Sequence, residues 1–179
     1  MTRVLCISGS PAEGSHTLTL LQTVGDMVQA LGAEVELWDL LAQPLPFSQP
    51  SWHKDPLSSG AQAVCDFYGA VIKADAVVLA TPLYHGSYSG LLKNALDCLT
   101  GDAFKGKRVG LVSHGSNIRK SHQPCIHLTT VIMAMEGTPV HTQVGTGKTD
   151  YEQTKEGLKL VEPDVLARCK QLAEELVKG

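Results

Sequence analysis

The chain begins with a strand pattern that passes into a helix pattern through one loop rich in glycine and hydroxyl groups. Residues 4–8 are almost continuously apolar, as expected of a strand buried on both faces of a parallel sheet. After the loop 9–17, apolar residues recur at helical spacing up to Gly32, a typical helix end; they are Leu18, Leu21, Val24, Val28 and Leu31. A strand, a loop and a helix in this order form the repeating unit of a parallel α/β sheet.

The rest of the chain continues this alternation. Further strands are predicted over residues 33–40, 76–81, 107–114 and 138–144, and further helices over residues 61–73, 90–99, 126–135 and 163–178. The segment 33–40 alternates like a strand with one wetter face, which favours an edge position. Residues 43–59 hold four prolines and no periodicity, which predicts a long surface loop of a kind that is uncommon unless functional. We therefore expect five parallel strands with helices on both faces, folded as one domain over residues 1–179.

Composition and charge argue against several classes of protein. The 15 basic and 18 acidic residues are scattered, so no basic stripe indicates nucleic-acid binding. The apolar start is interrupted at Gly9, too early for an export signal, and no long apolar run indicates a membrane segment, which together favour the cytoplasm. The five cysteines never form a Cys-x-x-Cys pair and the seven histidines lack metal spacing, so we expect neither a disulfide framework nor a metal site.

The loop 9–17 has the composition of a phosphate cradle. It offers the hydroxyls of Ser10, Ser15 and Thr17, two glycines, and the backbone N–H groups at the start of a helix. The helix dipole favours a dianion there even without a basic residue. The alternative is a plain turn followed by a helix N-cap. Glu13 supports that alternative, because its carboxylate would have to point away from a bound phosphate.

Two other nucleotide-binding motifs fit the chain less well. A dinucleotide-binding turn needs Gly-x-Gly-x-x-Gly, but Ser10 and Ser15 replace its second and third glycines, although Asp39 could be the acid of its second strand. A P-loop ends in Gly-Lys-Thr, which stands at residues 147–149. Its first glycine is missing from residues 139–142 and no helix pattern follows, so we interpret the tripeptide as a chance match.

The loop 81–90 joins a buried strand to a helix and combines an aromatic ring, an imidazole and closely spaced small residues. This mixture suits a flat heteroaromatic ring lying against the backbone. Tyr84 and Tyr88 could equally lie at the rim of a site or at a subunit interface. Ser89 is well placed to cap the helix that follows.

The chain resembles the NAD(P)H-dependent FMN reductase family, including flavin reductases that serve sulfonate monooxygenases, in two segments. These are Gly-Ser-Pro followed by Ser-x-Thr in residues 9–17, and Thr-Pro-Leu-Tyr followed by Tyr-Ser-Gly-Leu-Leu-Lys-Asn-Ala-Leu-Asp in residues 81–97. The resemblance covers roughly residues 3–145. It implies a flavodoxin-like doubly wound sheet with the strand order 2-1-3-4-5.

The resemblance also implies a set of FMN-binding residues. By position, the phosphate would be held by Ser10, Ser15, His16 and Thr17, and the isoalloxazine ring would be lined by Pro82, Leu83, Tyr84, His85 and Gly86. The ring would also be bordered by Ser113, His114, Gly115 and Ser116. No side chain is needed as a general acid or base, because the flavin carries out the bond chemistry. Ala12 and Glu13 depart from the family, since many members carry arginine in this loop.

The activity implied is hydride transfer from NADPH or NADH to FMN. In the interpretation we prefer, the reduced flavin then leaves to serve a flavin-dependent monooxygenase. In the alternative, tightly bound FMN reduces a quinone, an azo dye or a chromate-type oxyanion. A non-enzymatic flavodoxin-type electron carrier and a domain that has lost its site are further alternatives. Arg119 and Lys120 are candidates for contacting the 2′-phosphate of NADPH, although charges in a polar loop are usually just solvated.

The helix predicted over residues 90–99 has an apolar face wider than one sheet contact needs, formed by Leu91, Leu92, Ala95, Leu96 and Leu99. Simple core packing would explain this face equally well. Because the family commonly forms dimers or tetramers, we expect a homodimer or a homotetramer.

Overall fold

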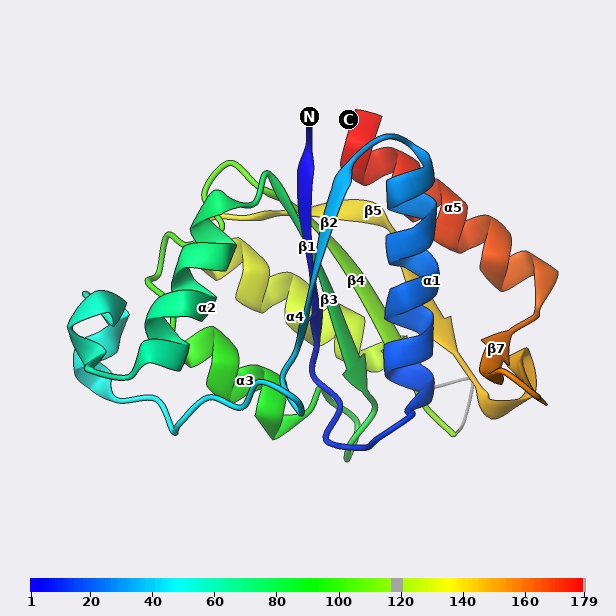
Figure 1. The fold of residues 1–179 in the computed structure, drawn as a ribbon, viewed down its shortest axis with the longest axis horizontal. Helices are drawn as coiled ribbons and strands as arrows, with labels where there is room; N and C mark the ends of the chain where they lie inside the picture. The colour runs from blue at the N-terminus through cyan, green and yellow to red at the C-terminus, as the bar shows by residue number, and fades with distance from the viewer. Residues whose placement is uncertain (117–120, 179) are drawn as a thin grey trace.

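A computed structural model describes residues 1–116 and 121–178, and its centre is a five-stranded parallel sheet (Figure 1). The strand order is β2-β1-β3-β4-β5, so the predicted flavodoxin-like order is confirmed. β2 lies at one edge, as its alternating pattern predicted. The strands are β1 (Arg3–Ser8), β2 (Glu34–Asp39), β3 (Ala76–Pro82), β4 (Arg108–His114) and β5 (Thr138–Thr146).

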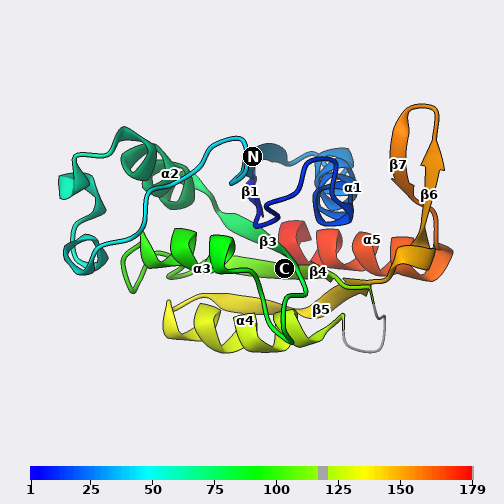
Figure 2. The ribbon, with the colours of Figure 1, turned by 90° about the horizontal axis from the view of Figure 1, so that it is seen from below.

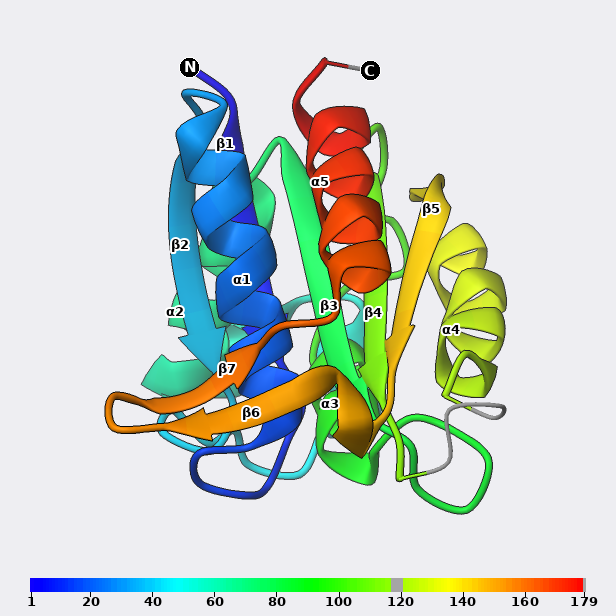
Figure 3. The ribbon, with the colours of Figure 1, turned by 90° about the vertical axis from the view of Figure 1, so that its right-hand side faces the viewer.

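Helices cover both faces of the sheet, as predicted. Figure 3 looks onto the face covered by α1 (His16–Ala30) and α5 (Pro163–Lys178), and Figure 2 shows helices on the opposite face. The helices of that face are α2 (Gln62–Lys73), α3 (Gly90–Asp97) and α4 (Gln123–Ala134). The helix predicted at residue 126 begins three residues earlier, because Pro124 suits a first helical turn.

Within the described residues, no helix combines the length and the apolar character that crossing a bilayer requires.

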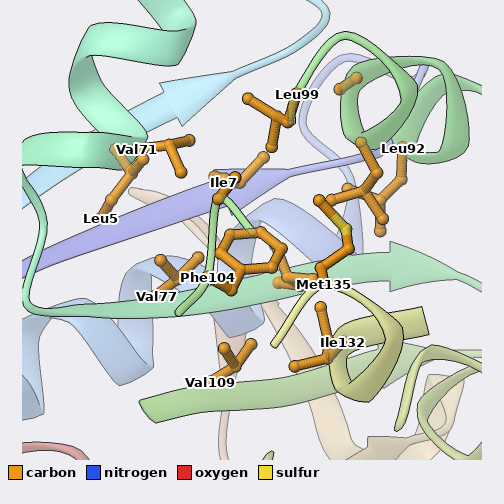
Figure 4. Packing of buried hydrophobic residues seen from close by; sticks show 14 of the residues in the cluster. Leu5, Ile7, Val71, Val77, Leu92, Leu99, Phe104, Val109, Ile132 and Met135 are labelled. Carbon is orange, nitrogen blue, oxygen red and sulfur yellow. The ribbon is translucent and has the colours of Figure 1, made fainter. Parts of the chain in front are cut away.

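Two layers of apolar side chains hold the helices to the sheet. Along β1, Leu5 and Ile7 face the layer under α2, α3 and α4, whereas Val4 and Cys6 face the layer under α1 and α5. Figure 4 shows the first of these layers, where Phe104 lies among the strand residues. The central strands therefore read as continuous apolar runs because both of their faces are covered.

The proline-rich loop 43–59 is anchored to the helices behind it. It contains two short 3₁₀ helices, η1 (Pro50–His53) and η2 (Pro56–Ser59). Trp52 is buried against residues of α2 and the end of α3. The side-chain amide of Asn94 on α3 both donates to and accepts from the loop backbone, each time at 3.0 Å.

The sequence prediction missed a small antiparallel hairpin after β5. A short 3₁₀ helix, η4 (Lys148–Asp150), leads into β6 (Tyr151–Thr154) and β7 (Gly157–Leu160). Figure 3 shows the hairpin lying across α1. Each strand has only four residues, too few alternations for the pattern to stand out in the sequence.

Candidate functional site

Three loops leave the carboxyl edge of the sheet side by side, after β1, β3 and β4 (Figure 1). Backbone hydrogen bonds join them to neighbouring strands. The N–H of Gly9 donates to the Ala80 carbonyl at 2.8 Å, and the N–H of Leu83 donates to the His114 carbonyl at 2.7 Å. Ligands of open parallel sheets bind at this edge, near the point where the strand order reverses.

Two serines of the first loop keep a hydrogen available for a ligand. Ser15 caps α1, where its Oγ accepts from the N–H of Leu18 at 3.1 Å. The Oγ of Ser10 accepts from the N–H of Ala12 at 3.3 Å. Each hydroxyl accepts from a backbone amide, and among the described residues neither donates its own hydrogen to an acceptor, so that hydrogen is available to a ligand.

The first turn of α1 adds backbone donors. The N–H groups of His16 and Thr17 occupy the first two helical positions, where a helix provides no acceptor. The side chains of Ser10 and Thr17 are only 2% and 1% exposed. Glu13 is exposed in the loop. Hydroxyl donors, unpaired amides and the positive end of a helix dipole together match a phosphate monoester.

Gly9 allows the first loop to approach α3 closely. A Cβ at this position would lie 2.6 Å from the Cβ of Leu92 and 3.1 Å from the Ala80 carbonyl oxygen. Ser89 Oγ accepts from the N–H of Leu92 at 3.1 Å and donates to the Gly9 carbonyl at 2.6 Å. Ser89 therefore caps α3, as predicted, and also ties α3 to the phosphate loop, which was not predicted.

Thr81 forms hydrogen bonds at both ends of the second loop. Its Oγ1 accepts from the N–H of Ser89 at 2.9 Å and donates to the Pro82 carbonyl at 3.0 Å. Thr81 and Ser89 therefore bring the two ends of the loop together. Sequence reasoning used both residues to recognise the family but did not find this contact.

The tip of the second loop is a tight turn in which Tyr84 and Ser87 exchange backbone hydrogen bonds of 2.9 and 3.0 Å. His85 and Gly86, at its centre, both have positive φ angles, of 49° and 83°, as a two-residue hairpin turn requires. Tyr84 is 45% exposed. Among the described residues, the N–H groups of His85 and Gly86 have no acceptor, so they are available to a ligand.

In the third loop, some residues pack against neighbouring segments and others are exposed. The Ser113 hydroxyl donates to the Ser121 carbonyl and lies 3.2 Å from Cys125 Sγ, so this side chain is directed toward α4. A Cβ at Gly115 would lie 2.9 Å from a methyl carbon of Leu83, which brings the second and third loops into contact. Ser116 is exposed.

Arg119 and Lys120, the candidates for a 2′-phosphate contact, lie outside the described residues.

His16, predicted at the flavin phosphate, and His114, predicted at the border of the ring, are stacked on each other. Their ring centroids are 4.4 Å apart and the rings are inclined by 13°. The edge of Tyr151 contacts both rings, with centroid distances of 4.8 and 5.5 Å. Tyr151 and Thr146, which hydrogen-bonds to His114, were absent from the sequence prediction.

The surroundings of the stacked rings favour their neutral forms. Burial lowers the pKa of His114 to about 4; the His16 charge adds to this shift, Asp150 opposes it and Lys148 adds to it again. Burial and, secondarily, Lys148 also lower the pKa of His16.

Comparison with known proteins identifies the family of this chain. A family model described as NADPH-dependent FMN reductase matches residues 2–150. The chain belongs to this family. It is 34% identical over 174 residues to an FMN-dependent NADPH-azoreductase of Staphylococcus haemolyticus (strain JCSC1435), covering 97% of this chain and 92% of the relative. It is 38% identical over 153 residues to an azoreductase of the same description from Staphylococcus saprophyticus, covering 86% and 81% of the two chains.

Solved structures show the same fold at lower identity. An NADH:FMN oxidoreductase (EMOB) in its apo form superposes with a TM-score of 0.79 at 24% identity, over 98% of this chain and 88% of that one. A flavodoxin from Streptococcus pneumoniae TIGR4 superposes with a TM-score of 0.65 at 16% identity, over 99% of each chain. The predicted family and fold are confirmed, and family membership makes this protein an NAD(P)H:FMN oxidoreductase with FMN as its flavin.

The described residues fit FMN at the phosphate end. Ser10 and Ser15 have hydrogens to donate, and the first-turn amides of His16 and Thr17 have no helical acceptor. The proposed ring loop offers two further backbone donors, from His85 and Gly86. The individual flavin contacts of these residues remain predictions.

Proposed function

We propose that this FMN reductase family member keeps its FMN bound and passes electrons from NAD(P)H to a small oxidised acceptor of the azo or quinone class. The observation that carries this choice is that relatives at 34% and 38% identity, aligned over most of the chain, are described as FMN-dependent NADPH-azoreductases. Release of reduced flavin to a partner oxygenase is the second candidate, and the motif in residues 81–97 supports it.

The chain's first task is to bind the flavin phosphate. In this proposal the hydroxyls of Ser10 and Ser15 donate to it, together with the N–H groups of His16 and Thr17. The hydrogen bond from Ser89 to the Gly9 carbonyl holds the loop 9–17 at a fixed distance from the loop 81–90. The phosphate loop therefore needs little rearrangement on binding, which lowers the entropic cost of holding the cofactor.

The second task is to orient the ring, and the loops after β3 and β4 supply its borders. Residues 82–86 and 113–116 would line it, with the side chain of Ser113 engaged toward α4 and the backbone of that segment left to face the ring. When bound, FMN supplies the hydride chemistry itself. The N–H groups of His85 and Gly86, which have no acceptor among the described residues, would donate to a ring that gains negative charge. We propose no catalytic side chain.

An absorbance experiment separates the candidates. The purified protein is scanned as isolated, after added FMN, and after NADPH without oxygen, and an azo dye is then added. Yellow protein as isolated, bleached by NADPH and reoxidised by the dye without free flavin, supports the proposal. Micromolar, exchangeable FMN supports the flavin-releasing candidate instead. Protein that neither binds FMN nor oxidises NADPH with FMN present contradicts both.

We also propose a homodimer or homotetramer in the cytoplasm. Support for assembly comes from α4, where Ile126 and Met133 are 61% and 64% exposed and lie two turns apart on one side of the helix. Support for a reducing compartment comes from the five cysteines, all of which are free thiols.

A further inference from the structure

The turn between β5 and β6, residues 146–151, contacts both histidines of the candidate site. At its start, Thr146 Oγ1 lies 3.1 Å from His114 Nδ1. At its end, the Tyr151 hydroxyl donates to the His16 carbonyl oxygen at 3.2 Å. The two hydroxyls lie 2.9 Å apart. A continuous chain of polar contacts therefore connects the end of β4 with the first turn of α1.

The turn is itself firmly held. The Asp150 carboxylate accepts from the N–H of Gly147 at 2.8 Å, across the turn. The Asp150 carbonyl accepts from the N–H groups of Val161 and Glu162 at 2.9 and 3.3 Å, which fixes the turn to the segment before α5. Tyr151 thus contacts His16 from a rigid support, and the contact restrains the position of the α1 amides.

The same turn carries a positive charge that the phosphate loop lacks. Residues 9–17 contain the acid Glu13 and no lysine or arginine. Lys148 is exposed, and no described carboxylate forms an ion pair with it. Lys148 stands two residues after Thr146 and three before Tyr151, the residues through which the turn contacts the two histidines. Its charge also lowers the pKa of both His16 and His114. His16 is the first residue of α1, so a dianion at this helix end would also lie close to the turn.

We propose that the turn 146–151 is part of the FMN phosphate site: Tyr151 is a positioning residue for the first turn of α1, and Lys148 supplies the positive countercharge. This inference rests on the proposed function. It also assigns the Gly-Lys-Thr tripeptide at residues 147–149 to phosphate binding. The phosphate would lie at the start of α1, which follows the loop 9–17 and not this tripeptide. The match to the family model ends at residue 150, one residue before Tyr151.

The test compares FMN with riboflavin, which has the same ring and no phosphate. Both ligands are titrated by flavin fluorescence into wild type, Lys148→Gln and Tyr151→Phe at low and high salt. Lys148→Gln is expected to weaken FMN about threefold and to reduce the salt dependence of FMN binding, because an exposed ion pair is modest and screened. Tyr151→Phe is expected to weaken FMN about fivefold, because α1 loses the hydrogen bond between the Tyr151 hydroxyl and the His16 carbonyl. Riboflavin affinity should change less than about twofold in both.

Matched controls separate this role from a general effect on the fold. Lys155→Gln removes an exposed lysine at the hairpin tip, and Tyr68→Phe removes a hydroxyl from a tyrosine on α2. Both should keep the wild-type ratio of FMN to riboflavin affinity. Undiminished riboflavin binding shows that each variant is folded.

The outcomes separate this inference from the proposed function. Wild type that prefers FMN, with a reduced preference in both variants, supports the inference. Wild type that binds FMN and riboflavin equally contradicts the phosphate site itself. Variants that keep the full FMN preference, or that lose both flavins equally, overturn the role of the turn and leave the proposed function standing.

Discussion

His114 illustrates how one side chain of the site responds to its surroundings. It is stacked on His16, contacted by Tyr151, and influenced by the charges of Asp150 and Lys148. Its folded pKa of about 4 lies below the usual value of about 6.5. Between these two values the unfolded chain binds the proton and the folded chain does not. Protonation therefore favours unfolding in this window, and stability falls as the pH decreases through it.

We predict that His114→Asn flattens this acid dependence. The free energy of unfolding of wild type should drop by about 1–2 kcal/mol more than that of the variant between pH 6.5 and 4.5, a figure reduced for partial exposure. Urea unfolding at several pH values measures the difference. His53→Asn, at an exposed position, is the control and should behave like wild type. Equal slopes for wild type and His114→Asn would show that the ring is not held neutral.

Gly9 is a second position where one added carbon atom is expected to change stability and FMN binding. Gly9→Ala would bring a Cβ to 2.6 Å from the Cβ of Leu92, and helix α3 would have to move. We expect a loss of about 1–3 kcal/mol in the free energy of unfolding, together with weaker FMN binding. Gly69→Ala on α2 is the control, because nothing lies within 4 Å of its added Cβ, and it should be neutral or stabilising. A stable, FMN-binding Gly9→Ala protein would refute the close approach.

At the scale of elements, α3 is fastened to the phosphate loop by Ser89. Its hydroxyl serves as the helix cap and as the donor to Gly9. Ser89→Ala removes both contacts and leaves the Gly9 carbonyl buried without this donor. We expect a loss of about 1–3 kcal/mol in unfolding free energy and lower FMN affinity, measured by urea unfolding and flavin titration. Ser51→Ala in the exposed η1 segment should change neither. If Ser89→Ala matched that control, the tie would be energetically irrelevant.

The elements also show which features could be read from sequence. β1, α1, β3 and the loops between them carry strong local patterns, so these elements and the first two loops were predicted from the residues, whereas the strand order followed from the family resemblance. The direction of Ser113 could have been inferred as well, because it shares strand parity with Leu111, which packs in the layer under α4. The contact between Tyr151 and His16 spans 135 residues and has no local signal. The hairpin β6–β7 was too short to be detected.

At the scale of the whole molecule, the exposed apolar side of α4 predicts association of copies. Met133→Glu places a charge on that side and should dissociate the oligomer. Light scattering is expected to show a multiple of the 19.1 kDa chain for wild type and a single chain for the variant. Lys170→Glu on α5 should leave the assembly unchanged. Wild type that runs as one chain would contradict the proposed homo-oligomer.

The central claim is that a flavin phosphate binds between the first loop and the start of α1. A crystal structure of the protein grown with FMN tests this most directly. We predict phosphate oxygens within hydrogen-bonding distance of Ser10, Ser15 and the N–H groups of His16 and Thr17, with the ring against residues 82–86. A phosphate bound at any other part of the molecule, or a first loop closed on its own side chains with FMN present, would contradict the account.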